Sequence, residues 1–257
     1  MVVINADDWG SETTITNRIL DCVECKKVDS VSAMVFMKDS RRAAEIAIEK
    51  GIDTGLHLNF TLSFTAEVPG RLLKFQSSII SFLKKHKLAQ VLYNPFIKNE
   101  FAYVYQKQVE EYSRLYKKEP SRIDGHNHMH LCANVIWGQL IPQNTFVRRN
   151  YSFLKNEKNF WNKKYRAVID SIIRKRYHCT DYFFHIQQFV KNSLIKEKIK
   201  NLLNNSISEV LVHPNQEIDY NVLNSTNFQK ILSGVPRCRF DKMINNRNRG
   251  LGAVSQM

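Results

Sequence analysis

Segments that favour β-strands alternate with segments that favour helices along most of this 257-residue chain. Apolar, strand-like segments cover residues 1–8, 30–37, 53–61, 121–130 (a strand running into a loop), 144–150 and 208–215. Segments with helical spacing of apolar residues lie between them, at 11–28, 40–51 and 99–118. Such alternation is typical of a parallel sheet or barrel with helices packed outside it. The sequence therefore predicts an α/β fold.

The remaining segments are less regular. Residues 62–98 read as an insertion that contains a helix at 78–86, and 151–205 read as largely helical, interrupted by the aromatic segment 181–186. In the segment 40–51, Gly51 lies just past the end of the predicted helix, at a position where a left-handed residue commonly ends a helix. Without repeats or a Gly/Ser linker, one domain is expected over 1–234. Residues 235–257 show neither helical nor strand periodicity. They are expected to be a poorly ordered tail, or a sequence altered relative to that of related proteins.

The charge, the cysteines and the N-terminal residues bear on the cellular location of the protein and on its binding partners. The formal charge is +14, and residues 148–200 hold 14 Lys and Arg against 4 Asp and Glu. A basic stretch can bind nucleic acid, but these charges are dispersed and match no known module, so a solvated helical face is the preferred interpretation. The five scattered cysteines, the lack of an N-terminal leader and the lack of a long apolar run predict a cytoplasmic protein that does not enter a membrane.

Polar residues recur where the predicted strands end. They are Asp7 and Asp8, His57 and Asn59, Asp124 to His130, Arg148 and Arg149, and His213. The carboxyl ends of parallel strands share one rim, where α/β proteins assemble their sites. Core packing alone does not explain acids, imidazoles and arginines at the ends of five strands. We therefore expect a site at this rim.

The densest cluster is the segment DGHNHMH, residues 124–130. If it were a strand, His126, His128 and His130 would share one face, because side chains alternate with a period of two. Aspartate and imidazole without clustered thiolates suit a divalent ion such as Zn²⁺, Mn²⁺ or Mg²⁺. Two histidines with one carboxylate leave positions open for water and substrate, as in catalytic sites. The segment therefore predicts a catalytic metal centre.

Four motifs, taken in order, resemble those of the YdjC-like carbohydrate deacetylase family. They are NADDWG (5–10), GLHLN (55–59), DGHNHMH (124–130) and VHPN (212–215). The resemblance implies an irregular (β/α) barrel like that of the polysaccharide deacetylases. It also implies a hydrolase that uses a divalent metal to remove acetyl groups from N-acetylated sugars such as chito-oligosaccharides. One ion is expected, Mg²⁺ or Zn²⁺, with a slight preference for Mg²⁺.

The resemblance also implies roles for individual residues. Asp8, His57 and His126 would bind the metal, Asp7 would be the general base, and His213 the general acid or oxyanion partner. Arg148 falls where the family has an arginine near the site, and would help to stabilise the oxyanion. The remaining expected contributors are Asp124, His128 and Asn59 as residues orienting the ligand imidazoles, and Trp9, Phe60, Tyr182 and Phe183 either as rings that stack on sugars or as core residues.

Other functions are compatible with parts of the pattern. Two histidines and one carboxylate can hold iron in an oxygenase, but those sites usually lie in β-sandwiches, and strand–helix alternation argues against one. A nucleic-acid-binding module is the second alternative. The expected partner is an acetylated sugar, a homodimer is left open, and nucleic acid is not expected.

Overall fold

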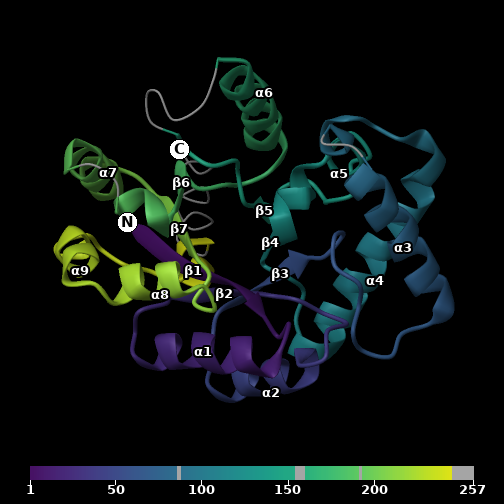
Figure 1. Ribbon diagram of the computed structural model, residues 1–257, viewed down its shortest axis with the longest axis horizontal. Helices are drawn as coiled ribbons and strands as arrows, with labels where there is room; N and C mark the ends of the chain where they lie inside the picture. The colour runs from purple at the N-terminus through teal and green to yellow at the C-terminus, as the bar shows by residue number, and fades with distance from the viewer. Residues whose placement is uncertain (86–87, 154–159, 191–192, 245–257) are drawn as a thin grey trace, which may run out of the picture.

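The computed structural model describes residues 1–85, 88–153, 160–190 and 193–244. At its centre is a seven-stranded parallel sheet with the order β5-β4-β3-β2-β1-β7-β6 (Figure 1). The strands are β1 Val2–Trp9, β2 Ser30–Ala33, β3 Thr54–Leu58, β4 Arg122–Gly125, β5 Phe146–Val147, β6 Tyr182–His185 and β7 Ser208–Val212. The predicted alternation of strands and helices is thus confirmed.

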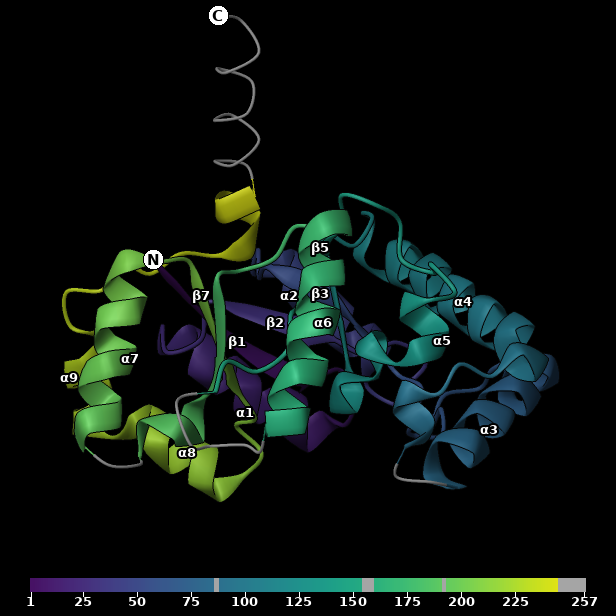
Figure 2. The same cartoon turned by 90° about the horizontal axis from the view of Figure 1, so that it is seen from above.

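The helices pack around this sheet on its outer side (Figures 1 and 2). The α-helices are α1 Thr13–Glu24, α2 Ser40–Glu49, α3 Gly70–Lys85, α4 Lys98–Tyr116, α5 Ala133–Ile136, α6 Phe160–Arg176, α7 Ser193–Asn205, α8 Glu217–Asn224 and α9 Thr226–Leu232. Short 3-10 helices are η1 Ala89–Val91, η2 Pro95–Ile97, η3 His126–Leu131 and η4 Ile186–Phe189. Gly51 has φ 61° just after α2, as its position predicts.

The sheet curls into an irregular barrel, which confirms the expected fold class. β5 and β6 are its two edge strands, and they do not form a ladder with each other. The chain just beyond β5 instead reaches β6, where the Ser152 N–H donates to the Phe183 carbonyl at 2.7 Å. The Phe183 N–H donates in return to the Ser152 hydroxyl at 3.0 Å. Side-chain and backbone contacts therefore join the two edges in place of a regular strand pair.

Two segments differ from the sequence-based expectation. The aromatic segment within 151–205 is not merely a break between helices, because Tyr182–His185 forms β6 beside β7. The histidine segment is not a strand, because β4 ends at Gly125 and η3 follows with left-handed backbone at Asn127 and His128. The proposed alternation of the three histidines on one strand face is therefore wrong.

The start of the expected tail is packed against the barrel. The Cys238 N–H donates to the Val2 carbonyl at 3.0 Å, and the Val2 N–H donates to the Pro236 carbonyl at 2.8 Å. Arg237 pairs with Asp29 at 2.8 Å, and Phe240 is buried. Residues 235–244 thus cover the end of the barrel where β1 begins, contrary to the expectation of disorder. The rest of the expected tail, 245–257, lies outside the described residues.

Candidate active site

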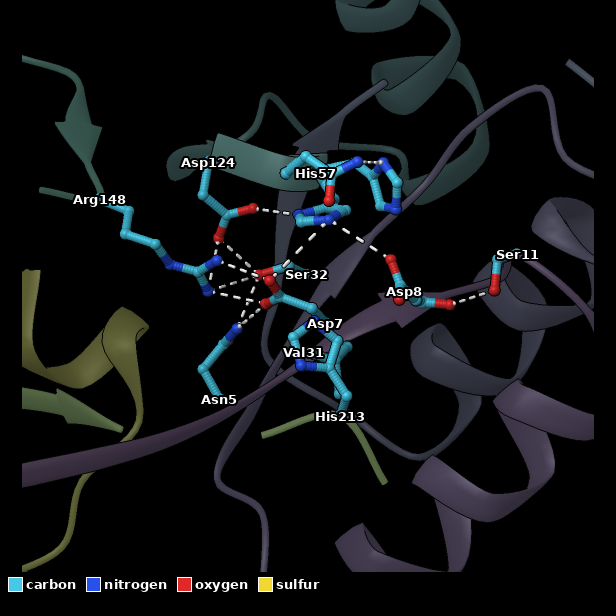
Figure 3. Close-up of polar contacts among 12 residues, drawn as sticks. Asn5, Asp7, Asp8, Ser11, Val31, Ser32, His57, Asp124, Arg148 and His213 are labelled. Carbon is cyan, nitrogen blue, oxygen red and sulfur yellow. Dashed lines mark hydrogen bonds and ion pairs between the residues drawn. The ribbon is translucent and has the colours of Figure 1, made fainter. Parts of the chain in front are cut away.

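Side chains from four strand ends meet at one cavity of about 210 Å³. Asp7 and Asp8 come from the end of β1 and His57 from β3, whereas His126 follows β4 and His213 follows β7. Figure 3 shows how Asp7, Asp8, His57 and His213 lie around this point. The expected rim at the carboxyl ends of the strands is therefore present, and these five predicted residues all line the cavity.

The backbone at Asp8 explains how two consecutive aspartates reach the same cavity. Neighbouring side chains on a regular strand point to opposite faces. Asp8 has φ 68°, and the register between β1 and β2 shifts between Ala6 and Trp9. The Ser11 hydroxyl donates to the Asp8 carbonyl at 2.7 Å and holds the turn. This local left-handed turn brings the Asp8 carboxylate beside that of Asp7.

Asp7 is held by a buried arginine. The two terminal nitrogens of Arg148 donate to the two Asp7 carboxylate oxygens at 2.7 and 2.8 Å. The same guanidinium lies 3.0 Å from Asp124 and 2.7 Å from Glu209. Its side chain is 1% exposed and stacks over the Phe183 ring at 5.0 Å. Arg148 is therefore enclosed by carboxylates and does not line the cavity.

His57 is oriented by Asp124. Its Nδ1 lies 2.6 Å from an Asp124 oxygen, so Nε2 faces the two aspartates of β1. This Nε2 is 3.5 Å from Asp8 Oδ1 and 3.9 Å from Asp7 Oδ2. A carboxylate behind an imidazole is the usual support of a metal-ligating histidine, and this contact is the one that the role predicted for Asp124 requires.

His126, like His57, is held through its Nδ1 atom. Thr61 Oγ1 lies 2.6 Å from His126 Nδ1, and the Asn127 amide lies 3.2 Å from the same atom. The rings of His57 and His126 are edge-on, with their centroids 6.1 Å apart. This leaves Nε2 of His126 for a bound ion.

The site carries more carboxylates than cations. Burial opposes the charged form of Asp7, but Arg148 and His57 outweigh it and hold the pKa of Asp7 below its usual value. Burial likewise opposes protonation of His57, yet the charges of Asp7 and Asp124 raise the pKa of His57 to about 10. Burial and the positive charge of His57 lower the pKa of His126. The negative charge around His57 favours a cation there, either a proton or a metal ion.

This part of the site can hold a divalent ion. Asp7, His57 and Asp124 bring ligand atoms within 4.8 Å of one another. One buried oxygen, Asp8 Oδ1, has no hydrogen-bond partner. A buried carboxylate oxygen without a partner is costly unless a cation binds there. The donor set of carboxylates and imidazoles fits a divalent metal.

Some predicted contributors have other contacts. His128 touches Tyr151 and Phe183 edge-on, with centroids 4.6 and 5.7 Å away, and no described hydrogen bond joins it to another imidazole. Asn59 accepts from the backbone N–H groups of Thr61 and Leu62 at 3.1 and 2.8 Å. Asn59 thus shapes the turn that carries Thr61, and it reaches His126 only through that residue.

The predicted sugar-stacking rings lie mainly in the core. Trp9, Phe60 and Phe183 are 0% exposed, and the Trp9 indole donates to the Ala43 carbonyl at 3.2 Å. Enclosed rings offer no face to a sugar, so the core interpretation holds for these three. Tyr182 is partly buried and stacks on Phe184 at 6.0 Å. None of the four lines the cavity at the strand ends.

Sequence reasoning missed two acidic residues beside the site. Glu209 lies inside β7 with 1% exposure and contacts Arg148. Asp219, in the first turn of α8, is 0% exposed and lies 3.6 Å from His213 Nδ1. Glu209 had a usable signal, because an acid inside the apolar stretch SEVLV must be paired when the strand is buried. Asp219 had no such signal, since its helix could have placed it in solvent.

Comparison with known proteins decides the family. The model of the YdjC-like protein family matches residues 1–234. The chain belongs to the YdjC-like family. Among curated relatives, a carbohydrate deacetylase of Danio rerio is 27% identical over 137 residues, covering 52% of this chain and 43% of the relative. A chitooligosaccharide deacetylase of Yersinia pestis (strain Pestoides F) is 27% identical over 136 residues, covering 52% of each chain.

These matches span about half the length of the curated relatives. Among solved structures, a putative cellobiose-phosphate cleavage protein of Enterococcus faecalis V583 superposes with a TM-score of 0.62. It is 17% identical to this chain, and the match covers 94% of this chain and 98% of the other. That likeness supports the fold alone.

Two broader expectations can be compared with the described residues. Within them, no helix combines the length and apolar character needed to cross a membrane. The basic stretch 148–200 begins with Arg148, which is enclosed by carboxylates, and with Arg149, which is half-buried and pairs with Asp170 at 2.5 Å. Part of its positive charge is therefore neutralised inside the protein.

Proposed function

We propose that this YdjC-like protein is a metal-dependent hydrolase that removes the N-acetyl group from acetylated amino sugars or short oligosaccharides. The observation that carries the proposal is the cavity at which Asp8, His57 and His126 offer ligand atoms beside Asp7 and His213. The printed functions of the relatives, carbohydrate and chitooligosaccharide deacetylase, supply the substrate class.

The metal would be held by Asp8, His57 and His126. Asp8 Oδ1 is buried without a partner, and His57 Nε2 is directed towards it. Asp7 and Asp124 are less suited as ligands, because both already bind the Arg148 guanidinium. When bound, a divalent ion polarises the acetyl carbonyl and lowers the pKa of a coordinated water.

Asp7 would accept the proton of the attacking water. Arg148 fixes the plane of its carboxylate through two hydrogen bonds and keeps it ionised at neutral pH. A general base must be both ionised and held in place. Arg148 has 1% side-chain exposure and three carboxylate neighbours, so it would hold Asp7 and would not touch the oxyanion, contrary to our sequence-based role for it.

His213 would protonate the leaving amine. It lines the cavity with Asp7 and Asp8, and it follows β7, which β3, β2 and β1 separate in the sheet from β4, the strand before His126. Burial alone would lower the pKa of His213, but the carboxylates of Asp219, Asp7 and Asp8 raise it. A raised pKa favours the protonated imidazole, the form that can act as an acid.

Acetate release tests the proposal. The purified chain is incubated with N-acetylglucosamine and with short chito-oligosaccharides, in the presence of Mg²⁺ or Zn²⁺, and the released acetate is measured. We expect release that chelation abolishes and metal restores, also without oxygen. Absence of acetate from every acetylated sugar, or oxygen-dependent turnover, would contradict it.

The identity of the metal, the cellular location and the oligomeric state are each tested separately. Elemental analysis of protein purified without added metal tests the preference for Mg²⁺ over Zn²⁺. Fractionation of cells tests the cytoplasmic location. Light scattering of the purified protein tests whether it forms a homodimer.

A further inference from the structure

A second cluster of titratable side chains lies beside the proposed metal site. Asp219 of α8 is 0% exposed, and two imidazoles approach one of its oxygens. His185 Nε2 lies 3.5 Å and His213 Nδ1 lies 3.6 Å from Asp219 Oδ2. The two rings are stacked, with centroids 5.8 Å apart and an angle of 28° between their planes. His213 Nδ1 is buried without a hydrogen-bond partner.

The hydrogen bonds of Asp219 fix its carboxylate. Its Oδ1 accepts from the Gln187 side-chain amide at 2.7 Å. Its Oδ2 accepts from the backbone N–H of His213 at 2.8 Å. The carboxylate is thus tied to η4 on one side and to the start of the loop after β7 on the other. A carboxylate held this way has a fixed direction towards the His213 ring.

The tautomer of His185 decides between a metal site and a hydrogen-bonded site. These three ligand atoms lie within 4.8 Å of one another, which would suit an ion. However, His185 Nδ1 accepts from the backbone N–H of Gln187 at 3.2 Å. A neutral imidazole carries one hydrogen, so an accepting Nδ1 places it on Nε2, the atom nearest Asp219. A protonated nitrogen cannot bind a metal, so His185 is not a metal ligand, and we interpret the cluster as one that handles protons.

We propose that Asp219 is a positioning residue that orients His213 for proton transfer, with His185 stacked on the same imidazole to keep it in that plane. The inference rests on the proposed deacetylase function. Asp219 draws the Nδ1 hydrogen of His213 to its own side, which leaves Nε2 to serve the cavity. We expect the 3.6 Å separation to shorten when substrate binds, as is common for catalytic hydrogen bonds.

The step that depends on this orientation is the collapse of the tetrahedral intermediate. The bond between the acetyl carbon and the sugar nitrogen breaks, and its electron pair stays on nitrogen. The nitrogen takes a proton from His213 Nε2, and acetate and the free amine leave. Asp219 neither gains nor loses a proton. Its effect is therefore confined to substrates whose leaving group needs that proton.

The experiment compares two leaving groups. Asp219→Asn and wild type are assayed on an N-acetylated sugar and on an acetyl ester with a good leaving group, with metal content and melting temperature measured in parallel. We expect kcat on the amide to fall about 10- to 100-fold, the usual range for a residue supporting a site, with unchanged KM and metal content. The fall on the ester should be clearly smaller.

Two further variants keep the test decisive. Gln187→Met removes one hydrogen bond to Asp219 and should move the amide-to-ester ratio in the same direction, by less, even if Asp219→Asn does not fold. Asp170→Asn removes a partly buried carboxylate that pairs with Arg149 outside the cavity, so it should leave the ratio unchanged.

Each result has one consequence. Equal losses on amide and ester in Asp219→Asn and in Gln187→Met would overturn the positioning role while the deacetylase function stands. Loss of a bound metal ion from Asp219→Asn would overturn the hydrogen-bonded interpretation of the cluster. Absence of acetate release by wild type would overturn the proposed function, and this inference with it.

Discussion

Asp7 and Asp8 are neighbours in sequence with different surroundings. Asp7 gives both oxygens to Arg148, whereas Asp8 keeps a buried oxygen without a partner beside His57. The left-handed backbone at Asp8 directs both carboxylates to one cavity. These surroundings fit the proposal that Asp7 accepts a proton and Asp8 binds a cation.

Isosteric substitution should separate the two roles. Asp7→Asn should bind metal normally and lose about 10²–10⁴-fold in kcat, the usual contribution of a general base. Asp8→Asn should lose metal affinity as well as activity. Isothermal titration with metal and acetate-release kinetics measure both. Near-normal turnover of Asp7→Asn would show that Asp7 is not the base.

Metal binding should release protons at neutral pH. In the metal-free protein, Asp7 and Asp124 raise the pKa of His57 to about 10, so this imidazole is protonated at pH 7. A metal ligand must give up its proton, so affinity should rise with pH up to that value. Calorimetry in buffers of different ionisation enthalpy should find about one proton released per ion. Binding without proton release would mean that His57 is not a ligand.

At the scale of elements, β7 contributes a buried acid as well as core residues. Glu209 is the third carboxylate around Arg148, and burial raises its pKa to about 7 from its ordinary value of 4.5. An acid whose pKa is raised on folding stabilises the fold below pH 4.5 and loses that contribution as pH rises through 7. β7 therefore makes stability depend on pH.

Glu209→Gln should remove this dependence. Between pH 4.5 and pH 8, the pKa shift of Glu209 should lower the free energy of unfolding of wild type by up to about 3 kcal/mol. The side chain in Glu209→Gln has no acidic proton, so this variant should not show that fall. Urea unfolding at pH 5 and pH 8 in chelated buffer measures it. Asp53→Asn, which alters the buried pair with Arg122 at the opposite end of the barrel, is the control. Parallel pH profiles of wild type and Glu209→Gln would contradict the assignment.

Elements with local sequence patterns could be predicted, and elements that depend on long-range contacts could not. Strands such as β7 and helices such as α2 were predictable because their apolar patterns and end signals are local. β6 was missed because four aromatic and polar residues between helices become a strand only by pairing with β7. The turn of η3 was missed because left-handed backbone at His128 is imposed by packing against Tyr151 and Phe183. The cavity residues were nevertheless predictable, since strand ends meet at one rim in any parallel barrel.

At the scale of the whole molecule, residues 235–244 cover the barrel end opposite the cavity. Phe240 is 1% exposed, stacks over Arg122 at 4.4 Å and contacts the Phe146 ring at 5.4 Å. Its backbone N–H donates to Asp53 at 3.0 Å. No local sequence pattern predicts that this segment is ordered, because its order comes from long-range contacts with β1 and with the barrel end where β1 begins.

Removing that ring should destabilise the protein without changing its chemistry. Phe240→Ala should lower the free energy of unfolding by about 3–5 kcal/mol, the usual cost of a buried Phe cavity. Phe96→Ala, at a ring that is 91% exposed, should have little effect and is the matched control. Urea unfolding measures both. If Phe240→Ala is as stable as Phe96→Ala, the packed position of this segment is wrong.

The position of the metal ion tests the central claim most directly. Anomalous diffraction from crystals of Zn²⁺-loaded protein would locate the ion among these side chains. We expect one strong peak within about 2.0–2.2 Å of an Asp8 oxygen and of one ring nitrogen each of His57 and His126. In that structure Asp7 would remain bound to Arg148. A peak bonded instead to Asp124, or one found only between His185 and Asp219, would contradict it.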